Sequence, residues 1–153
     1  MSIWWIPAEV SHVAEIARKC RAADRDEIWA AEKITPEEAL LNGLAMSPVT
    51  WTGVADGLPI CMFGVSPWCI LGAAGAPWMI GTTDIKPHAR AFLKGSKKAL
   101  EAMREPYDML VNLVDARHVQ AIRWLKWLGF TVHAPIPYGP FGMAFHPFEW
   151  RRI

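Results

Sequence analysis

The feature that most constrains the fold is a helical segment placed between two short apolar runs. Residues 78–83 and 109–114 are short and largely apolar, which indicates two strands. Between them, apolar residues recur at helical spacing from His88 until Pro106 ends the pattern. A strand, a helix and a second strand make a βαβ unit, whose strands are parallel and whose crossover is right-handed. The sequence therefore predicts at least one parallel strand pair.

The N-terminal segment predicts a strand followed by helical structure. Residues 3–6 form a short apolar strand that Pro7 ends, and apolar residues then recur at helical spacing from 10 to 20. Asp24 and Glu27 have the spacing of a capping box. We expect them to open a short turn.

A helix and a β-hairpin come next. The run Thr35-Pro36-Glu37-Glu38 combines an N-cap threonine, a proline at the first helical position and a glutamate at the third, and predicts a helix to about residue 46. Residues 50–55 and 58–65 are rich in β-branched and aromatic side chains, and Asp56-Gly57 between them is typical of a tight hairpin turn. The middle of the chain is therefore predicted to be antiparallel sheet.

The last third predicts one more helix and two strands. Asp115 or the residues just after it can cap the helix, and Gly129 is the expected glycine at its end. Residues 130–136 and 143–148 are predicted strands joined by the turn at 137–140. We therefore predict a single α/β (α+β) domain over residues 1–153, with a mixed, mostly antiparallel sheet, a central parallel pair and flanking helices.

Composition and charge narrow the classes of partner. A length of 153 residues with 52% hydrophobic and 20% charged residues suits one folded domain. A formal net charge of +1 gives no general attraction to nucleic acid or anionic membrane, and we expect neither partner. Prolines at 59, 67 and 77 interrupt the longest apolar stretch, and the first residues lack the pattern of a secretion signal, so we expect a cytoplasmic protein.

Cysteine and histidine spacing predicts no metal site. The three cysteines lack a Cys-x-x-Cys pair and are expected to be buried thiols, and the histidines lack the spacing of metal ligands. The cysteines are Cys20, Cys61 and Cys69.

The C-terminal half resembles the GNAT-type N-acyltransferases. The order of predicted elements matches that family, and residues 117–130 are similar to its late motif, usually Asn-x-x-Ala, an apolar helix and then Leu-Gly-Phe. Ala121 and the run Leu128-Gly129-Phe130 match the motif, whereas His118 stands where the family usually has asparagine. Leu125 stands where many members carry a tyrosine that protonates the departing thiolate.

A narrower resemblance is to the small GNAT-like internal virion or head-assembly proteins of T7-type phages. It spans about residues 51–130 and implies a phage setting, in the host cytoplasm or in the virion, without fixing a chemistry. The residues that carry it are Trp51-Thr52-Gly53, Asp56-Gly57-Leu58-Pro59, Trp78-Met79-Ile80-Gly81-Thr82, Tyr107-Asp108, Asn112 and His118 to Lys126.

The family resemblance implies a site for acetyl-CoA or another acyl-CoA. In GNAT enzymes the parallel strands diverge, the pantetheine arm pairs with the first of them, and the pyrophosphate lies at the start of the following helix. Here the implied strand is residues 78–83, and Met79 or Ile80 would polarise the thioester carbonyl through its backbone N–H. The implied pyrophosphate loop is Lys86-Pro87-His88-Ala89-Arg90-Ala91, with Ala89 where the family has glycine and Ala91 acceptable at the last position. Lys86, His88 and Arg90 either add positive charge to this site or form a solvated basic turn.

The catalytic residues of such a site have two interpretations each. Asp84 either accepts the proton of the amine, directly or through water, or caps the next helix, as Thr83 could also do. Tyr138 or water would protonate the thiolate, because Leu125 has no proton to give. His118 either makes a backbone hydrogen bond near the cofactor arm or caps its helix.

Two functions therefore stay open at this stage. One is an acyl-CoA-dependent N-acyltransferase acting on a small amine or a protein amine. The other is a GNAT fold kept as a catalytically inactive virion component or assembly partner, whose partners would be phage or host proteins.

Overall fold

A computed structural model describes residues 2–68 and 73–153. Cys69 lies outside the described residues. Within them, the helices are α1 (Val13–Arg18), α2 (Ala22–Glu32), α3 (Pro36–Met46), α4 (Ala89–Arg104) and α5 (Val119–Trp127), with 3₁₀ segments at Val10–His12 and Thr83–His88. The strands are β1 (Trp4–Pro7), β2 (Val49–Ala55), β3 (Leu58–Pro67), β4 (Ala74–Gly81), β5 (Met109–Asp115), β6 (Thr131–Val132), β7 (Ile136–Tyr138) and β8 (Met143–Arg151).

The described strands form one mixed sheet. Its order is β1-β2-β3-β4-β5-β8-β6, and β7 pairs with β8. The pairing of β4 with β5 is parallel, and all other pairings are antiparallel. This arrangement confirms the predicted fold class, a mostly antiparallel sheet with a central parallel pair that a helix connects.

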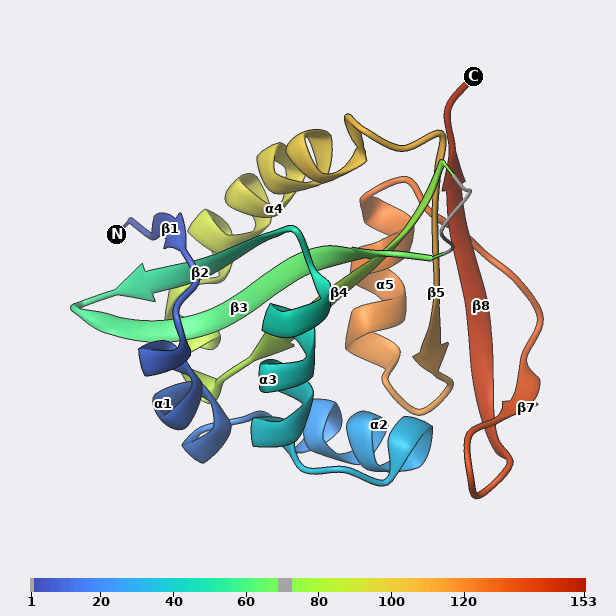
Figure 1. Ribbon diagram of the computed structural model, residues 1–153, viewed down its shortest axis with the longest axis horizontal. Coiled ribbons are helices and arrows are strands. Elements are labelled where there is room, and N and C mark those ends of the chain that lie inside the picture. Colours follow the sequence, from blue (N-terminus) through green and yellow to red (C-terminus); the bar gives the residue numbers. More distant parts are fainter. Residues whose placement is uncertain (1, 69–72) are drawn as a thin grey trace.

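Helices cover both faces of the sheet (Figure 1). On one face, Val13 and Ile16 of α1 and Leu40 of α3 pack with Met62 and Ile80 of the central strands. On the other face, α4 and α5 pack in a second cluster that includes Leu100, Met103, Leu110, Leu125 and Phe148. α2 lies at the end of the sheet where β5 finishes, in contact with β5 and α3.

Most predicted start and stop signals act as expected. The side chain of Thr35 accepts a hydrogen bond from Glu38 N, and the capping box opens α3. Asp56 and Gly57 both have positive φ, at 52° and 78°, and turn the chain from β2 into β3. Gly129 has a φ of 101° after α5, where the left-handed region suits only glycine without strain.

Three local predictions were wrong. Asp24 and Glu27 do not open a short turn but lie inside an 11-residue helix, α2, whose N-cap is Arg21. The predicted strand at 78–83 begins earlier and ends at Gly81, because a 3₁₀ segment with Thr82 as its N-cap follows directly. The predicted strand at 130–136 is reduced to two residues in β6, because only Thr131 and Val132 find partners on β8 before the chain turns to β7.

Cys20 and Cys61 are buried free thiols, as predicted. Burial raises the pKa of Cys20 to about 11 and that of Cys61 to about 12, so both thiols are protonated at neutral pH. Within the described ranges, the helices include none that is long and apolar enough to cross a membrane.

Candidate functional site

The parallel strands β4 and β5 pair only where they begin. Their register joins Ala74 to Met109 and Gly75 to Leu110, and no further pair forms between the described parts of these strands. Pro77 is one physical cause, because it has no backbone N–H to donate to β5. Its carbonyl instead accepts a hydrogen bond of 2.8 Å from the side chain of Asn112, on β5. A side chain thus replaces the backbone ladder where the strands diverge.

The divergence leaves backbone groups of β4 facing the opening. In a strand, the N–H and C=O of successive residues point alternately to the two edges. The Pro77 carbonyl and the Gly81 N–H both bond to groups on the β5 side, to Asn112 and Asp24. Met79, midway between them in the same register, therefore directs its N–H and C=O into the opening, whereas those of Ile80 point toward β3.

A cavity of about 550 Å³ fills the space between the diverging strands and the helices α4 and α5. A volume of this size suits a small-molecule or cofactor site. Apolar side chains supply most of its walls, and polar groups gather at one end. Its lining residues include Arg21, Asp24, Glu27, Met79, Lys86, Ala89, Leu125 and His118.

α2 closes the wide end of the opening. Asp24 Oδ2 accepts a hydrogen bond of 2.9 Å from Gly81 N at the end of β4. Glu27 Oε2 accepts one of 2.9 Å from Asp115 N at the end of β5. Residues three apart on a helix lie on the same face, so one face of α2 holds the ends of both strands. The helix therefore sets how far apart they lie.

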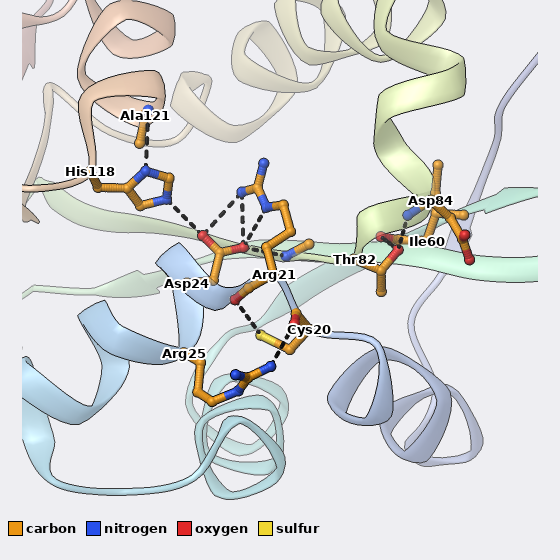
Figure 2. A network of polar contacts seen from close by, with 10 residues as sticks. Cys20, Arg21, Asp24, Arg25, Ile60, Thr82, Asp84, His118 and Ala121 are labelled. Atoms are coloured by element: carbon orange, nitrogen blue, oxygen red, sulfur yellow. Dashed lines mark hydrogen bonds and ion pairs between the residues drawn. The ribbon is translucent and has the colours of Figure 1, made fainter.

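Asp24 is the centre of a buried polar network (Figure 2). Arg21 binds its carboxylate in a bidentate manner, at 2.9 Å from Nε and 3.0 Å from Nη2. His118 Nε2 lies 2.8 Å from Asp24 Oδ1, while His118 Nδ1 accepts a 3.4 Å hydrogen bond from Ala121 N. The ring proton of a neutral His118 therefore belongs on Nε2, where it is donated to Asp24. Burial alone would raise the pKa of Asp24, but these donors outweigh it and lower that pKa below its usual range.

The pKa of Glu27 is shifted in the opposite direction to that of Asp24. Burial raises the pKa of its carboxyl from 4.5 to about 7, and the hydrogen bond from Asp115 N offsets only part of that effect. A carboxyl with this pKa exchanges its proton at neutral pH. Asp24 and Glu27, one helical turn apart, thus differ in charge state at physiological pH.

No family model matches the sequence, and no curated protein matches it. Solved structures do match. Among them are yncA from Salmonella typhimurium with its cofactor acetyl-CoA (TM-score 0.72, 14% identity, covering 99% of this chain and 94% of that one) and a GCN5-related N-acetyltransferase from Kribbella flavida (TM-score 0.71, 18% identity, covering 99% and 98%). A chain of the NatC complex bound to Gag peptide and CoA matches over 100% of both chains, with a TM-score of 0.72 and 17% identity. The chain has the GNAT fold.

The GNAT fold brings some of the predicted site residues to the cavity and leaves others outside its walls. Lining residues include Met79, Lys86, Ala89 and His118. His88 is buried, with Nε2 at 3.5 Å from Asp56 Oδ2 and with Nδ1 lacking a partner among the described residues. The residues outside the lining set are Ile80, Asp84, His88, Arg90, Ala91 and Tyr138.

The two predicted catalytic residues have other neighbours. Asp84 forms an ion pair of 3.1 Å with Lys19. Tyr138 lies on β7, where its ring packs edge-on against Phe145 at a centroid distance of 5.3 Å. Thr82, rather than Thr83 or Asp84, is the N-cap of the 3₁₀ segment and accepts from Asp84 N.

The start of α4 differs in detail from expectation, whereas the start of α5 agrees with it. The 3₁₀ segment runs directly into α4, and the Ala89 N–H donates to Lys86 O, so this amide is already used. His118 is the N-cap of α5 through its bond from Ala121 N, which confirms the capping interpretation of this histidine.

Four residues contribute to the site although no role there was predicted for them from the sequence: Arg21, Asp24, Glu27 and Asn112. The three-residue spacing of Asp24 and Glu27 was itself the signal, since the same spacing that suits a capping box also places two side chains on one helix face. Only the fold decides between these outcomes. Among residues 2–68 and 73–153, no group of three or more His, Cys, Asp and Glu side chains is arranged to hold a metal ion.

Proposed function

We propose that this protein is an acyl-CoA-dependent N-acyltransferase. The observation that carries the proposal is the edge of β4 at Met79, whose N–H and C=O face a cavity of about 550 Å³ between two diverging parallel strands. An extended chain with amide groups can bind such an edge as an additional strand. The pantetheine arm of CoA has this chemistry, and yncA, with the same fold, is bound to acetyl-CoA.

The residues present fit an acyl thioester. The N–H of Met79 is a donor for the thioester carbonyl, and the C=O of Met79 is an acceptor for an amide N–H. Apolar walls between α4 and α5 suit the uncharged part of the arm, and Lys86, exposed in the cavity wall, offers a cation to the diphosphate. When bound, acyl-CoA supplies the acyl group in an activated form.

Leu125 lines the cavity and cannot donate a proton, so in this proposal water protonates the departing thiolate. Thiolates are good leaving groups because the pKa of a thiol is only about 8.5. Acyl transfer is therefore possible without the tyrosine that many GNAT enzymes carry, because the thiolate can leave before it is protonated. The inactive virion role is a prediction of the sequence resemblance alone.

Isothermal titration with acetyl-CoA tests the proposal. Binding is expected, and its absence for acetyl-CoA and for longer acyl-CoA thioesters would reject the function. Lys86→Glu should weaken binding more than Arg90→Glu, since both variants change the net charge equally but only Lys86 lines the cavity.

A second pair of variants tests the role of Met79. Met79→Pro removes the N–H that faces the cavity and leaves the ladder to β3 intact, as Pro77 already does two residues earlier. Met79→Leu keeps the N–H and is the matched control. We expect the proline variant to bind acetyl-CoA roughly threefold to tenfold more weakly than the leucine variant, the usual value of one hydrogen bond.

A further inference from the structure

We infer that Glu27 is the residue that takes the proton from the acceptor amine. The inference rests on the proposed acyl transfer and adds to it a catalytic residue, which acts on an acceptor amine that arrives as its ammonium ion. Glu27 lies on the inner face of α2, at the wide end of the opening between β4 and β5.

The carboxylate of Glu27 is held in a fixed position. Its Oε2 is held by Asp115 N at 2.9 Å, which fixes the side chain against the end of β5. Its Oε1 makes no hydrogen bond to any described residue, and Glu27 is part of the cavity wall. One oxygen is therefore anchored by a group that stays in place, while the other is available to a ligand in the cavity. A base needs this combination of fixed geometry and a free lone pair.

The other carboxylates near the opening are either paired or outside the cavity wall. Asp24 lines the cavity, but its oxygens accept from Arg21, His118 and Gly81 N, so it is held as an anion and positions α2. Asp115 is bound by the side chain of Arg117 and is not part of the wall. Asp84 is paired with Lys19 and is also outside the wall. Glu27 is the one carboxylate among the lining residues that has a free oxygen.

Both negative and positive groups surround Glu27. On its own helix, Asp24 opposes its ionisation, and Asp115 on β5 does the same. His118 at the start of α5 favours the ionised form. The cations of this region, Arg21 and Arg117, are paired with Asp24 and Asp115. Burial is the largest influence and brings the pKa of Glu27 to about 7, which suits a group that must both accept and release a proton near neutral pH.

Acyl transfer then proceeds by direct attack of the amine on the thioester. The ammonium loses one proton to Glu27 Oε1, directly or through one water, and the freed nitrogen lone pair forms a bond to the acyl carbon. The carbon–sulfur bond breaks, its electron pair leaves with sulfur, and the second nitrogen proton is lost to water. The thiolate takes a proton from water, and the carboxylic acid of Glu27 returns its proton to solvent. The products are an amide and free thiol.

The test compares Glu27→Gln with the wild-type protein. Glutamine has the same shape, and its amide oxygen can still accept from Asp115 N, so the anchor to β5 remains. Glu32→Gln, an exposed position on the same helix, is the matched control. n-Propylamine in excess serves as the probe acceptor, and thiol release from acetyl-CoA is measured over a range of pH.

Glu27→Gln should bind acetyl-CoA with wild-type affinity but lower kcat by about 100-fold to 10,000-fold, the usual contribution of a general base. The rise of kcat/KM through a midpoint near pH 7 should be present in the wild type and in Glu32→Gln, and absent from Glu27→Gln. A variant that keeps both the rate and that rise would overturn the inference. Failure of the wild type to bind acetyl-CoA would instead reject the proposed function.

A second measurement does not depend on turnover of the probe. Carbon-13 labelling of glutamate carboxyl groups, with Glu27→Gln used to assign the signal, reports the titration of Glu27 directly. A midpoint near pH 7 that moves when acetyl-CoA binds supports the inference. A titration midpoint near 4.5, or a signal that does not change when acetyl-CoA binds, overturns the inference. This holds even if the wild type does not acylate n-propylamine.

Discussion

The burial of Glu27 predicts that the proposed base reduces the stability of the protein at alkaline pH. Its pKa is about 7 in the folded protein and 4.5 is the ordinary value. A group whose pKa is raised on folding contributes stability that is fully present below pH 4.5 and is lost as the pH rises through 7. Glu27→Gln removes this ionisation. We therefore expect the variant to become more stable than the wild type as the pH increases.

The size of this loss of stability follows from the difference between the pKa of Glu27 in the folded protein and its ordinary value. One pKa unit corresponds to about 1.4 kcal/mol, so the change from 4.5 to about 7 corresponds to roughly 3 to 4 kcal/mol of unfolding free energy as an upper bound. Partial access of water to the cavity reduces this value, and we expect between about 1 and 3 kcal/mol above pH 8. At about pH 4 the carboxyl is neutral in both states, and the contribution falls to nearly zero.

Urea unfolding of the two proteins at about pH 4 and about pH 8.5 measures this effect, provided that the m-values agree. The quantity to compare is the difference in free energy between variant and wild type at each pH. Glu32→Gln, on the exposed side of α2, should show no such change. An equal difference at both pH values, or a variant less stable at the higher pH, would refute the reasoning.

Three further predictions concern the elements that hold the site together. Gly139→Ala should cost about 1 to 3 kcal/mol more in urea unfolding than Gly142→Ala, because both have positive φ but a Cβ at 139 would collide with Ala30 O on α2. Equal losses would show that this contact can relax. Asp24→Asn should cost about 3 kcal/mol at pH 7 in unfolding experiments, since it breaks a buried network. The pKa of Asp24 is lowered in the folded wild type, so the difference in unfolding free energy between wild type and variant should shrink as the pH falls below 3.8. A difference that does not change with pH would contradict the ionised state of Asp24. Asn112→Ala leaves the Pro77 carbonyl without its partner and should weaken acetyl-CoA binding in calorimetry by roughly threefold to tenfold, whereas unchanged binding would show that the divergence of β4 and β5 does not depend on it.

Local signals in the sequence were sufficient for most of the architecture. The helix after His88, placed between two apolar runs, required a parallel pair, and the capping box at Thr35 and the Asp56-Gly57 turn each act through neighbouring residues only. The resemblance of residues 117–130 to the late GNAT motif led to the fold that the solved structures share. These features depend on contacts between residues close in sequence, and a reader of the sequence can see them.

The site depended on contacts that sequence spacing does not reveal. The spacing of Asp24 and Glu27 is compatible with capping a turn and with lying on one helix face. Packing of α2 against the ends of β4 and β5 favours the helix. The backbone partners on those strands lie 57 residues from Asp24 and 88 residues from Glu27 along the chain. Burial and the neighbours supplied by other elements then lowered the pKa of one carboxyl and raised that of the other. The sequence alone determined most of the elements and their order. The tertiary structure decided that residues 22–32 form a helix, which of its carboxylates is neutralised by partners, and which one keeps a free oxygen in the cavity.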